Sequence, residues 1–392
     1  MKKLRIFETF SGIGAQTKAL SNIKNIDFEN VGISEWYIDA IIAYAKTHHN
    51  KEFFKLKQEL EKNNISKKDI ISEYENNPHY VFSSNSKTAS KLTSIKELKI
   101  KELYVANKVS NNFGSIAEIK GKDLPQNIDI FTYSFPCQSI SLQGKQGGLS
   151  QDSETTSSLV WQVLRLLKEA KEHNNQPKVL LMENVKSLFS KKFIDTWNEI
   201  KEILSDFGYN TYDTTINAID KGSVQRRERV FAVSILKKLD TGFEYNNSDK
   251  KKNKKMFKDI LEDTIPENFI ANNLKKHIEN EKMEMRPSGV EYLVLKNYTT
   301  FQSENILYSI EGKSPTLTAS GANSRLKMID KNGDLRYILP IEAWQLMGFE
   351  KKDFEPNKEL SKATLLRLAG NSISVEAIQD IFEDIISQVF NK

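Results

Sequence analysis

The first twenty residues constrain the fold more than any other stretch of the chain. The run from Leu4 to Phe10 has the length and apolar character of a buried strand, and Ser11-Gly12-Ile13-Gly14 breaks it. The residues from Ala15 to Leu20 then follow a helical pattern. Glycines let the backbone turn tightly and bring a helix N-terminus close to a ligand. This order predicts an α/β fold that begins with a nucleotide-binding βαβ unit, although the G-x-G-x-x-G fingerprint is incomplete.

The next predicted strand, Val31 to Ser34, ends in Glu35-Trp36. An acidic residue at the end of the second strand suits the two hydroxyl groups of a ribose. Trp36 beside it has the flat face on which an adenine can pack. The competing interpretation is an exposed carboxylate at a helix start for Glu35 and a core aromatic for Trp36.

Two further strands deliver reactive groups to the same sheet edge. The run Ile128 to Phe131 leads to Pro136 and to Cys137, the single cysteine of the chain, and the run Pro177 to Met182 ends at Glu183. Ligands of open α/β sheets bind at the carboxyl ends of the strands, so the thiol and the carboxylate are expected to lie together. The alternatives are a buried, inert thiol and a capping carboxylate.

A basic cluster, Gln225-Arg226-Arg227-Glu228-Arg229, stands just before another predicted strand that runs to Leu236. The alternative interpretation is that this cluster is a solvent-exposed basic turn without a functional role. Beside a thiol and a carboxylic acid it suggests chemistry on a pyrimidine. A thiolate can add to C6, a glutamic acid can protonate N3, an arginine can stabilise charge on O2, and the resulting enamine can attack a methyl cation equivalent through C5.

The composition excludes several other classes of protein. The chain has 392 residues, enough for two domains, and its one cysteine rules out an internal disulfide framework and a cysteine-cluster zinc site. The five histidines show no HExxH spacing, so no catalytic metal is expected. The start is too polar for a signal peptide, and no apolar run approaches a membrane span, which predicts a cytoplasmic protein. The net charge of +5 is compatible with nucleic acid.

The predicted domain order follows shifts in composition. Residues 1–236 form a catalytic domain, in which about 50–110 is a charged insertion with helical spacing whose face is expected to be solvated rather than to bind DNA. Residues 237–335 lack βα alternation and contain short β-like pieces, which predicts a smaller, mostly β domain. A hinge at 336–362 and a return to the catalytic domain at 363–392 complete the order. The glycine-rich segment after Cys137 has the composition of an active-site lid.

Seven stretches, spread over the whole chain and in the family's order, make the sequence resemble the DNA (cytosine-5)-methyltransferases. They are Phe10-x-Gly12-x-Gly14, Glu35-Trp36, Phe135-Pro136-Cys137-Gln138, Glu183-Asn184-Val185, Gln225-x-Arg227-x-Arg229, Pro315-Thr316-Leu317 and Gly370-Asn371-Ser372. The resemblance implies a Rossmann-like S-adenosylmethionine-dependent methyltransferase core with a smaller, mostly β target-recognition domain.

The resemblance also assigns roles to residues. Cys137 would be the nucleophile, Glu183 would bond N3 and the amino group of the target cytosine, Arg229 would hold O2, and Arg227 would support the loop or a phosphate. The S-adenosylmethionine pocket would be lined by Phe10, Gly12, Gly14, Glu35, Trp36, Ser115, Ile116, Pro136, Leu159, Asn371 and Ser372. Gly114-Ser115-Ile116 is expected to end another strand. The sequence departs from the family there, since an aspartate usually bonds the adenine amino group at the position of Ser115; Ser115 or Glu118 would have to replace it.

Double-stranded DNA is the implied partner, with the target base flipped out of the duplex and loop 139–154 closing over it. The stretches Asn297 to Asn305 and Thr318 to Arg325 look similar to the recognition regions of bacterial CpG-specific members, so a short site containing CG is expected. The residues expected to contact DNA are Gln143, which could fill the space of the flipped base, and Gln225, Ser303, Glu304, Thr318, Ser324 and Arg325.

Two other functions remain open from the sequence. A tRNA branch shares this core but has a reduced recognition region, whereas this chain devotes roughly a hundred residues to it. A DNA-binding homologue without catalysis is disfavoured by Cys137, Glu183 and Arg229. Kinship suggests a nucleoid-associated bacterial monomer in a restriction-modification system, whose cognate endonuclease acts separately, with no membrane partner.

Overall fold

The computed structural model describes residues 3–136, 158–246, 255–279 and 282–391. The chain divides into two compact units, each described by itself below. The first unit comprises Met1–Ile216, Glu228–Asn246 and Ile381–Lys392, and the second comprises Asn217–Arg227 and Asn247–Asp380. The functional boundaries expected from composition remain predictions.

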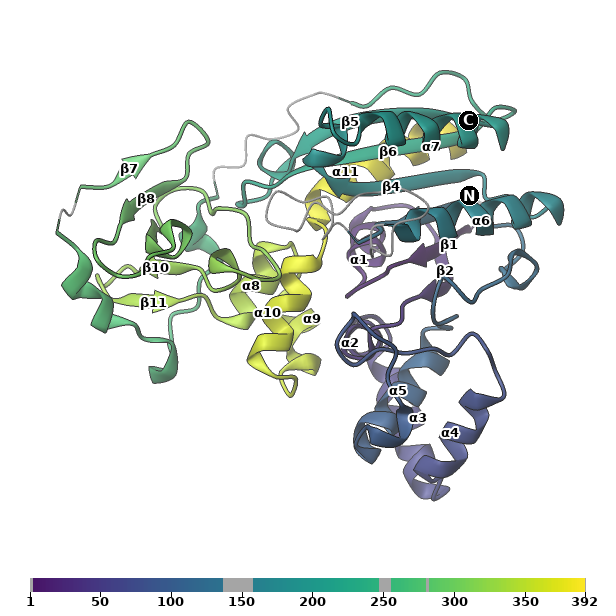
Figure 1. Ribbon diagram of the computed structural model, residues 1–392, viewed down its shortest axis with the longest axis horizontal. Helices are drawn as coiled ribbons and strands as arrows, with labels where there is room; N and C mark the ends of the chain where they lie inside the picture. Colours follow the sequence, from purple (N-terminus) through teal and green to yellow (C-terminus); the bar gives the residue numbers. More distant parts are fainter. Residues whose placement is uncertain (1–2, 137–157, 247–254, 280–281, 392) are drawn as a thin grey trace. The chain divides into compact units, whose positions relative to one another are not determined.

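A six-stranded sheet in the order β2-β1-β3-β4-β6-β5 forms the centre of the first unit (Figure 1). Strands β1 to β4 run parallel, and β6 is antiparallel to β4. The carboxyl ends of β1, β2, β3 and β4 therefore meet at one edge, as the sequence predicts. The strands are β1 Leu4–Thr9, β2 Phe28–Ser34, β3 Ile130–Tyr133, β4 Val179–Val185, β5 Tyr209–Asn217 and β6 Glu228–Leu236.

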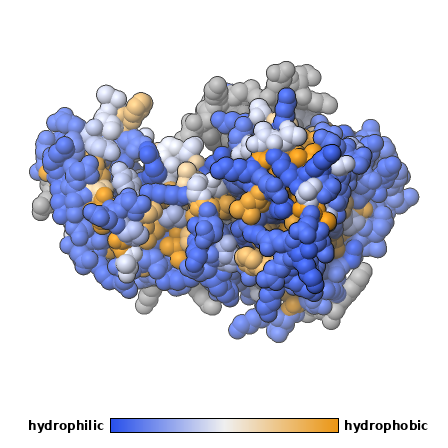
Figure 2. All heavy atoms as spheres, turned by 90° about the horizontal axis from the view of Figure 1, so that it is seen from below, coloured by the Kyte–Doolittle hydropathy of each residue, from blue (hydrophilic) through white to orange (hydrophobic). Residues whose placement is uncertain are grey.

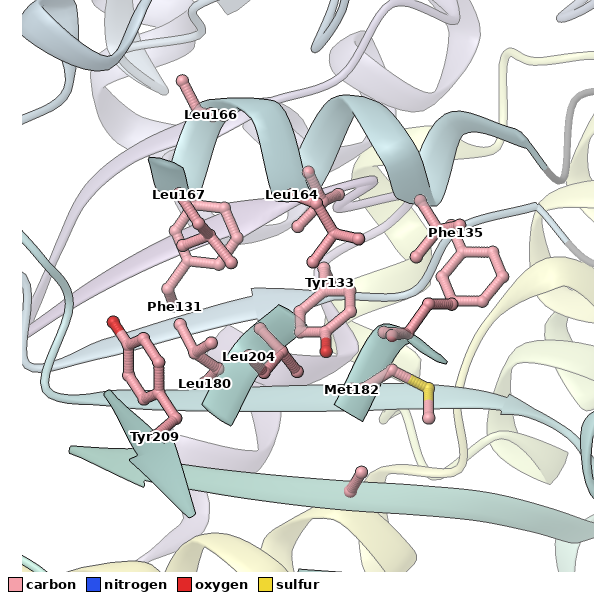
Figure 3. Packing of buried hydrophobic residues seen from close by; sticks show 14 of the residues in the cluster. Phe131, Tyr133, Phe135, Leu164, Leu166, Leu167, Leu180, Met182, Leu204 and Tyr209 are labelled. Atoms are coloured by element: carbon pink, nitrogen blue, oxygen red, sulfur yellow. The ribbon is translucent and has the colours of Figure 1, made fainter. Parts of the chain in front are cut away.

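Helix α6, Leu159–Glu172, shows how the sheet is covered. Its apolar residues recur at helical spacing, and Val163, Leu166, Leu167 and Ala170 are buried. Figure 3 shows the side chains of Phe131, Tyr133 and Phe135 packed between α6 and the β4 residues Leu180 and Met182. This packing fixes the chain that runs from β3 toward the reactive edge. The other helices beside the sheet are α1 Ala15–Asn22, α2 Ile38–His48 and α7 Ile194–Asp206.

The segment from 50 to 110 contains three α-helices, which gather with α2 around a hydrophobic core of their own (Figure 1). They are α3 Asn50–Lys62, α4 Lys67–Glu75 and α5 Glu97–Val109. The strand expected to end at Gly114-Ser115-Ile116 is absent: residues 110–116 make one parallel bridge, between Ile33 and Asn112. The physical reason is the positive φ of Asn111 (45°) and Gly114 (75°), because extended backbone needs negative φ.

The second unit contains a five-stranded sheet in the order β11-β10-β9-β8-β7, in which β9 and β10 are parallel and the other neighbouring strands are antiparallel. Its strands are short, as the sequence predicts: β7 Glu284–Met285, β8 Glu291–Val294, β9 Ile306–Ser309, β10 Lys327–Ile329 and β11 Leu335–Tyr337. The helices that follow are α8 Pro340–Leu346, α9 Lys351–Phe354, α10 Lys362–Asn371 and α11 Val375–Ile385, the last of which contains the final boundary between the units.

Within the described ranges no helix is long and apolar enough to cross a membrane. Hydrophilic residues cover most of the face shown in Figure 2, with smaller apolar patches between them.

Candidate active site

The glycine turn after β1 has the strained backbone that its sequence implies. Phe10 (φ 54°), Gly12 (φ 55°) and Gly14 (φ 77°) all adopt positive φ, and the Phe10 N–H donates to the Ser34 carbonyl at the end of β2, 2.8 Å away. A Cβ on Gly14 would lie 2.2 Å from the His48 ring, so only glycine fits there. A Cβ on Gly12 would meet nothing within 4 Å. The turn therefore packs tightly on one side and is open at Gly12.

Glu35, at the end of β2, joins this turn. Its carboxylate accepts the N–H of Gly12 at 3.0 Å and the N–H groups of Trp36 and Tyr37 at 2.8 Å each. Burial raises the pKa of the Glu35 carboxyl, and the three N–H donors oppose that shift. The structure thus brings Gly12 and Glu35 together, with Trp36 next to them in the chain.

The segment after Asn112 lies beside the end of β2. The Ser34 hydroxyl donates to the Gly114 carbonyl at 2.9 Å, and the Asn112 side-chain carbonyl accepts the N–H of Glu35 at 3.0 Å. In the same segment Ser115 is partly buried and Ile116 is buried. The Ser115 hydroxyl accepts the N–H of Ala117 at 3.4 Å, and the Glu118 carbonyl contacts the His79 ring.

The chain leaving β3 is tied to β4 two residues before the predicted nucleophile. The Asn184 amide donates to the Phe135 carbonyl at 3.1 Å, and both groups are buried. Pro136 is the last described residue before the gap at 137–157, so Cys137 and Gln143 lie outside the described residues. Leu159 begins α6 and packs partly buried against the core.

Glu183 and Arg229 form an ion pair on the first unit's sheet. The Arg229 Nε lies 3.3 Å from a Glu183 carboxylate oxygen, and both side chains are largely buried. In the antiparallel β4–β6 pair, Arg229 stands opposite Val185 and Phe231 opposite Glu183, so the two charged residues lie diagonally on one face. This pairing holds a carboxylate and a guanidinium side by side on the sheet.

Gln225 and Arg227 belong to the second unit and are buried there. The Arg227 guanidinium donates to the carbonyls of Leu317, Gly370 and Ser372 at 2.7–3.2 Å. The Gln225 amide donates to the Leu346 carbonyl and accepts the N–H of Leu317. Arg227 thus supports the segments that carry Leu317 and Ser372. Gln225 has no exposed surface with which to contact DNA in this structure.

Asn371 and Ser372 follow Gly370 at the end of α10, Asn371 exposed and Ser372 buried. A Cβ on Gly370 would lie 2.3–2.4 Å from the backbone of Thr318 and Ala319, so the turn needs glycine to approach this segment. These residues are in the second unit, whereas the glycine turn and Glu35 are in the first.

Five of the residues expected to contact DNA lie close together in the second unit: Ser303, Glu304, Thr318, Ser324 and Arg325. Ser303 and Glu304 are in one 3-10 turn, Gln302–Asn305, and Ser324 ends another, Ala322–Ser324, next to it. The Arg325 guanidinium lies 3.5 Å from the Glu304 carboxylate. The Thr318 N–H donates to the Asn323 carbonyl at 3.2 Å, which ties it to the same turn.

Sequence reasoning did not single out Lys327 in the second unit or Glu8 in the first, although both ionisable side chains are buried. Glu8 is fully buried in β1, where its Oε1 accepts hydrogen bonds from Thr17, from Asn30 (2.7 Å) and from Tyr44 (3.3 Å). The Tyr44 ring is also among the atoms that a Cβ on Gly14 would meet, at 2.7 Å. The available signal was a charged residue in a strand whose neighbours, Phe7 and Ile6, are apolar.

Glu8→Gln is expected to change how stability depends on pH. Desolvation raises the pKa of Glu8 from 4.5 to about 7. The native state therefore binds more protons here than the unfolded state, and stability falls as pH rises from about 4.5 through 7. A neutral amide removes this loss, which is at most about 3 kcal/mol. Urea unfolding should find the variant more stable than wild type at pH 8, with a smaller gain at pH 5.

Glu59→Gln, on the exposed face of α3, is the control and should change stability little at either pH. An equal effect of Glu8→Gln at both pH values would contradict the buried, proton-binding role of Glu8.

Solved structures share this architecture. The chain aligns with the Entamoeba histolytica methyltransferase EhMeth with a TM-score of 0.62 at 17% identity, covering 99% of each chain. It aligns with the S. pombe Dnmt2 methyltransferase with a TM-score of 0.62 at 17% identity, covering 98% of this chain and 99% of the other. The predicted fold class is confirmed: the protein has the α/β methyltransferase fold, with a second, smaller sheet.

Sequence comparison narrows the class. The profile of the family described as C-5 cytosine-specific DNA methylase matches residues 82–387. The orphan methyltransferase M.SssI of Spiroplasma monobiae is 38% identical over 389 residues, 98% of this chain and 97% of the relative. The type II methyltransferase M2.ScrFI of Lactococcus lactis subsp. cremoris is 33% identical, over 97% and 99%. The chain belongs to the C-5 cytosine-specific DNA methylase family and is a DNA (cytosine-5-)-methyltransferase, as its motifs predict.

Proposed function

We propose that the protein transfers a methyl group from S-adenosylmethionine to C5 of a cytosine flipped out of duplex DNA, through a covalent bond between Cys137 and C6. The observation that carries the proposal is the Glu183–Arg229 pair, 3.3 Å apart. Next to it, Asn184 holds the Phe135 carbonyl, two residues before Cys137. A carboxyl group and a guanidinium beside the segment that precedes Cys137 therefore support this proposal.

The first unit fits the proposed cofactor. Glu35 offers a carboxylate suited to ribose hydroxyls, and Trp36 an aromatic face suited to adenine. The turn is open at Gly12, and the buried Ser11 hydroxyl has no hydrogen-bond partner among the described residues. When bound, S-adenosylmethionine supplies an electrophilic methyl carbon. Gly12, Glu35 and Trp36 would hold its nucleoside part.

The protein's own groups perform the proposed steps on the cytosine. The Cys137 thiolate forms a bond to C6, while Glu183 provides a proton at N3 and Arg229 donates hydrogen bonds to O2. The electron pair of the C5–C6 bond then becomes available at C5, which accepts the methyl group. Return of the N3 proton to Glu183, loss of the C5 proton to water and expulsion of the thiolate restore the aromatic ring and the free enzyme, and S-adenosylhomocysteine is the other product.

The proposed target is a short site containing CG. Its support is the similarity of residues 297–305 and 318–325 to recognition regions of CpG-specific members, together with the proximity of Glu304 and Arg325. Carboxylates accept from the cytosine amino group and arginines donate to guanine, so this pair has the chemistry that a C·G base pair needs.

The test is transfer of a labelled methyl group to duplex DNA, followed by bisulfite sequencing of the product. Cytosines protected at CG are expected, and hairpin duplexes with every CG changed to GC should stay unmodified. Equal methylation of both duplexes would refute the CG target alone. Transfer to tRNA with none to DNA would refute the DNA substrate.

A further inference from the structure

Lys327 is a buried lysine at the start of β10, in the second unit. Its side chain is only 3% exposed, and its amine donates to Glu304 Oε2 at 2.9 Å. The amine also lies 5.5 Å from the centre of the Tyr298 ring. A buried ammonium group is costly unless it is paired, so the Glu304 carboxylate and the Tyr298 ring keep Lys327 in place.

The backbone that carries Glu304 is fixed as well. The Asn305 side chain accepts the N–H and the hydroxyl of Thr299 and donates to the Thr299 carbonyl, all at 2.9–3.1 Å. The Glu304 N–H donates to the Phe301 carbonyl at 2.9 Å. The loop 299–305 is thus closed on itself, and Lys327 then determines where the Glu304 carboxylate points.

The second oxygen of Glu304 faces a different kind of partner. Its Oε1 lies 3.5 Å from Arg325 Nη2, and the Arg325 side chain is 62% exposed. Exposed ion pairs of this length contribute little and are easily exchanged for another partner. Glu304 therefore has one oxygen held by a buried lysine and one paired with a cation that can turn toward DNA.

We propose that Lys327 is the positioning residue for base recognition: it holds Glu304 so that Oε1 and the Arg325 guanidinium read one C·G pair in the major groove. The cytosine N4 amine would donate to Oε1, and guanine O6 and N7 would accept from Arg325. Two cations around one carboxylate leave a net positive charge, which favours approach to phosphates. This inference rests on the proposed function and extends it to target selection.

Lys327→Met tests the inference because methionine fills similar space without the charge. The readout is the ratio of kcat/KM on a duplex with a central CG to that on a duplex in which this step is CA paired with TG. Loss of a positioned base contact should lower the ratio about tenfold, while Lys327→Arg, which keeps a donor, should largely preserve it. Lys296→Met is the matched control, since Lys296 pairs with Glu279 at 2.7 Å but is exposed, and its ratio should not change.

A second pair of variants separates positioning from folding. If Lys327 acts through Glu304, adding Lys327→Met to Glu304→Gln should leave the ratio within about twofold of that of Glu304→Gln alone. Equal losses on both duplexes, or a further fall in the double variant, would overturn the inference. The wild-type protein tests the proposed function. If it shows no preference for CG, both the proposed CG target and the positioning role of Lys327 are refuted. A wild type that discriminates while Lys327→Met discriminates equally well refutes the inference alone.

Discussion

Cys137→Ala is expected to lower methyl transfer by at least about 10³-fold while leaving DNA binding intact. C5 of cytosine is a weak nucleophile until a group adds at C6, and alanine has no group that can add. The chain contains one cysteine, so no neighbouring thiol can replace it. The change removes a single sulfur atom, and the phosphate contacts that dominate DNA affinity should be unaffected.

The measurement pairs labelled-methyl transfer with a binding assay on the same duplex at one salt concentration. A duplex with 5-fluorocytosine at the target adds a direct test, because fluorine cannot leave C5 as a proton does. Wild type should then form a covalent complex that survives denaturation, and Cys137→Ala should form none. Methyl transfer by Cys137→Ala at a wild-type rate would exclude the proposed mechanism.

The sheet could be predicted because burial leaves a clear mark on parallel strands. Nearly all residues of β1, β3 and β4 are buried, and apolar residues predominate in β3 and β4. The segment before Ile116 was expected to end a strand, but it does not form one. Its one apolar side chain, Phe113, is only partly buried, and positive φ at Asn111 and Gly114 prevents extended pairing.

The contacts between strand ends were also predictable, since neighbouring parallel strands bring their carboxyl ends together. Gly12 with Glu35 follows from that rule, while Glu183 with Arg229 depends on β6 returning antiparallel beside β4. The burial of Arg227 could not be foreseen, because its carbonyl partners are 90 to 145 residues away in the chain.

The same limit applies to Lys327. It was inconspicuous among 57 lysines and arginines until the fold placed it beside Glu304. A charged side chain is exposed by default, and only the tertiary fold reveals the partner that permits its burial.

Glu183→Gln is expected to lower kcat by about 10²–10⁴-fold with little change in affinity for DNA. The amide keeps the shape of the side chain, and its oxygen can still accept from Arg229 Nε, 3.3 Å from the carboxylate in the wild type. Its nitrogen can donate a hydrogen bond to N3 but cannot transfer a proton there. Because C6 then stays a poor electrophile, the loss should fall on the chemical step.

Single-turnover methyl transfer, with enzyme in excess over duplex, isolates that step from product release. Glu228→Gln is the matched control. Glu228 is the first residue of β6, next to Arg229, but its carboxylate pairs with the exposed Lys186 at 3.0 Å. Its single-turnover rate should stay within about twofold of wild type, as for surface pairs of small energy. If both variants lose activity equally, or if Glu183→Gln loses DNA binding instead of rate, Glu183 acts in maintaining the sheet edge or the DNA contact rather than in protonating N3.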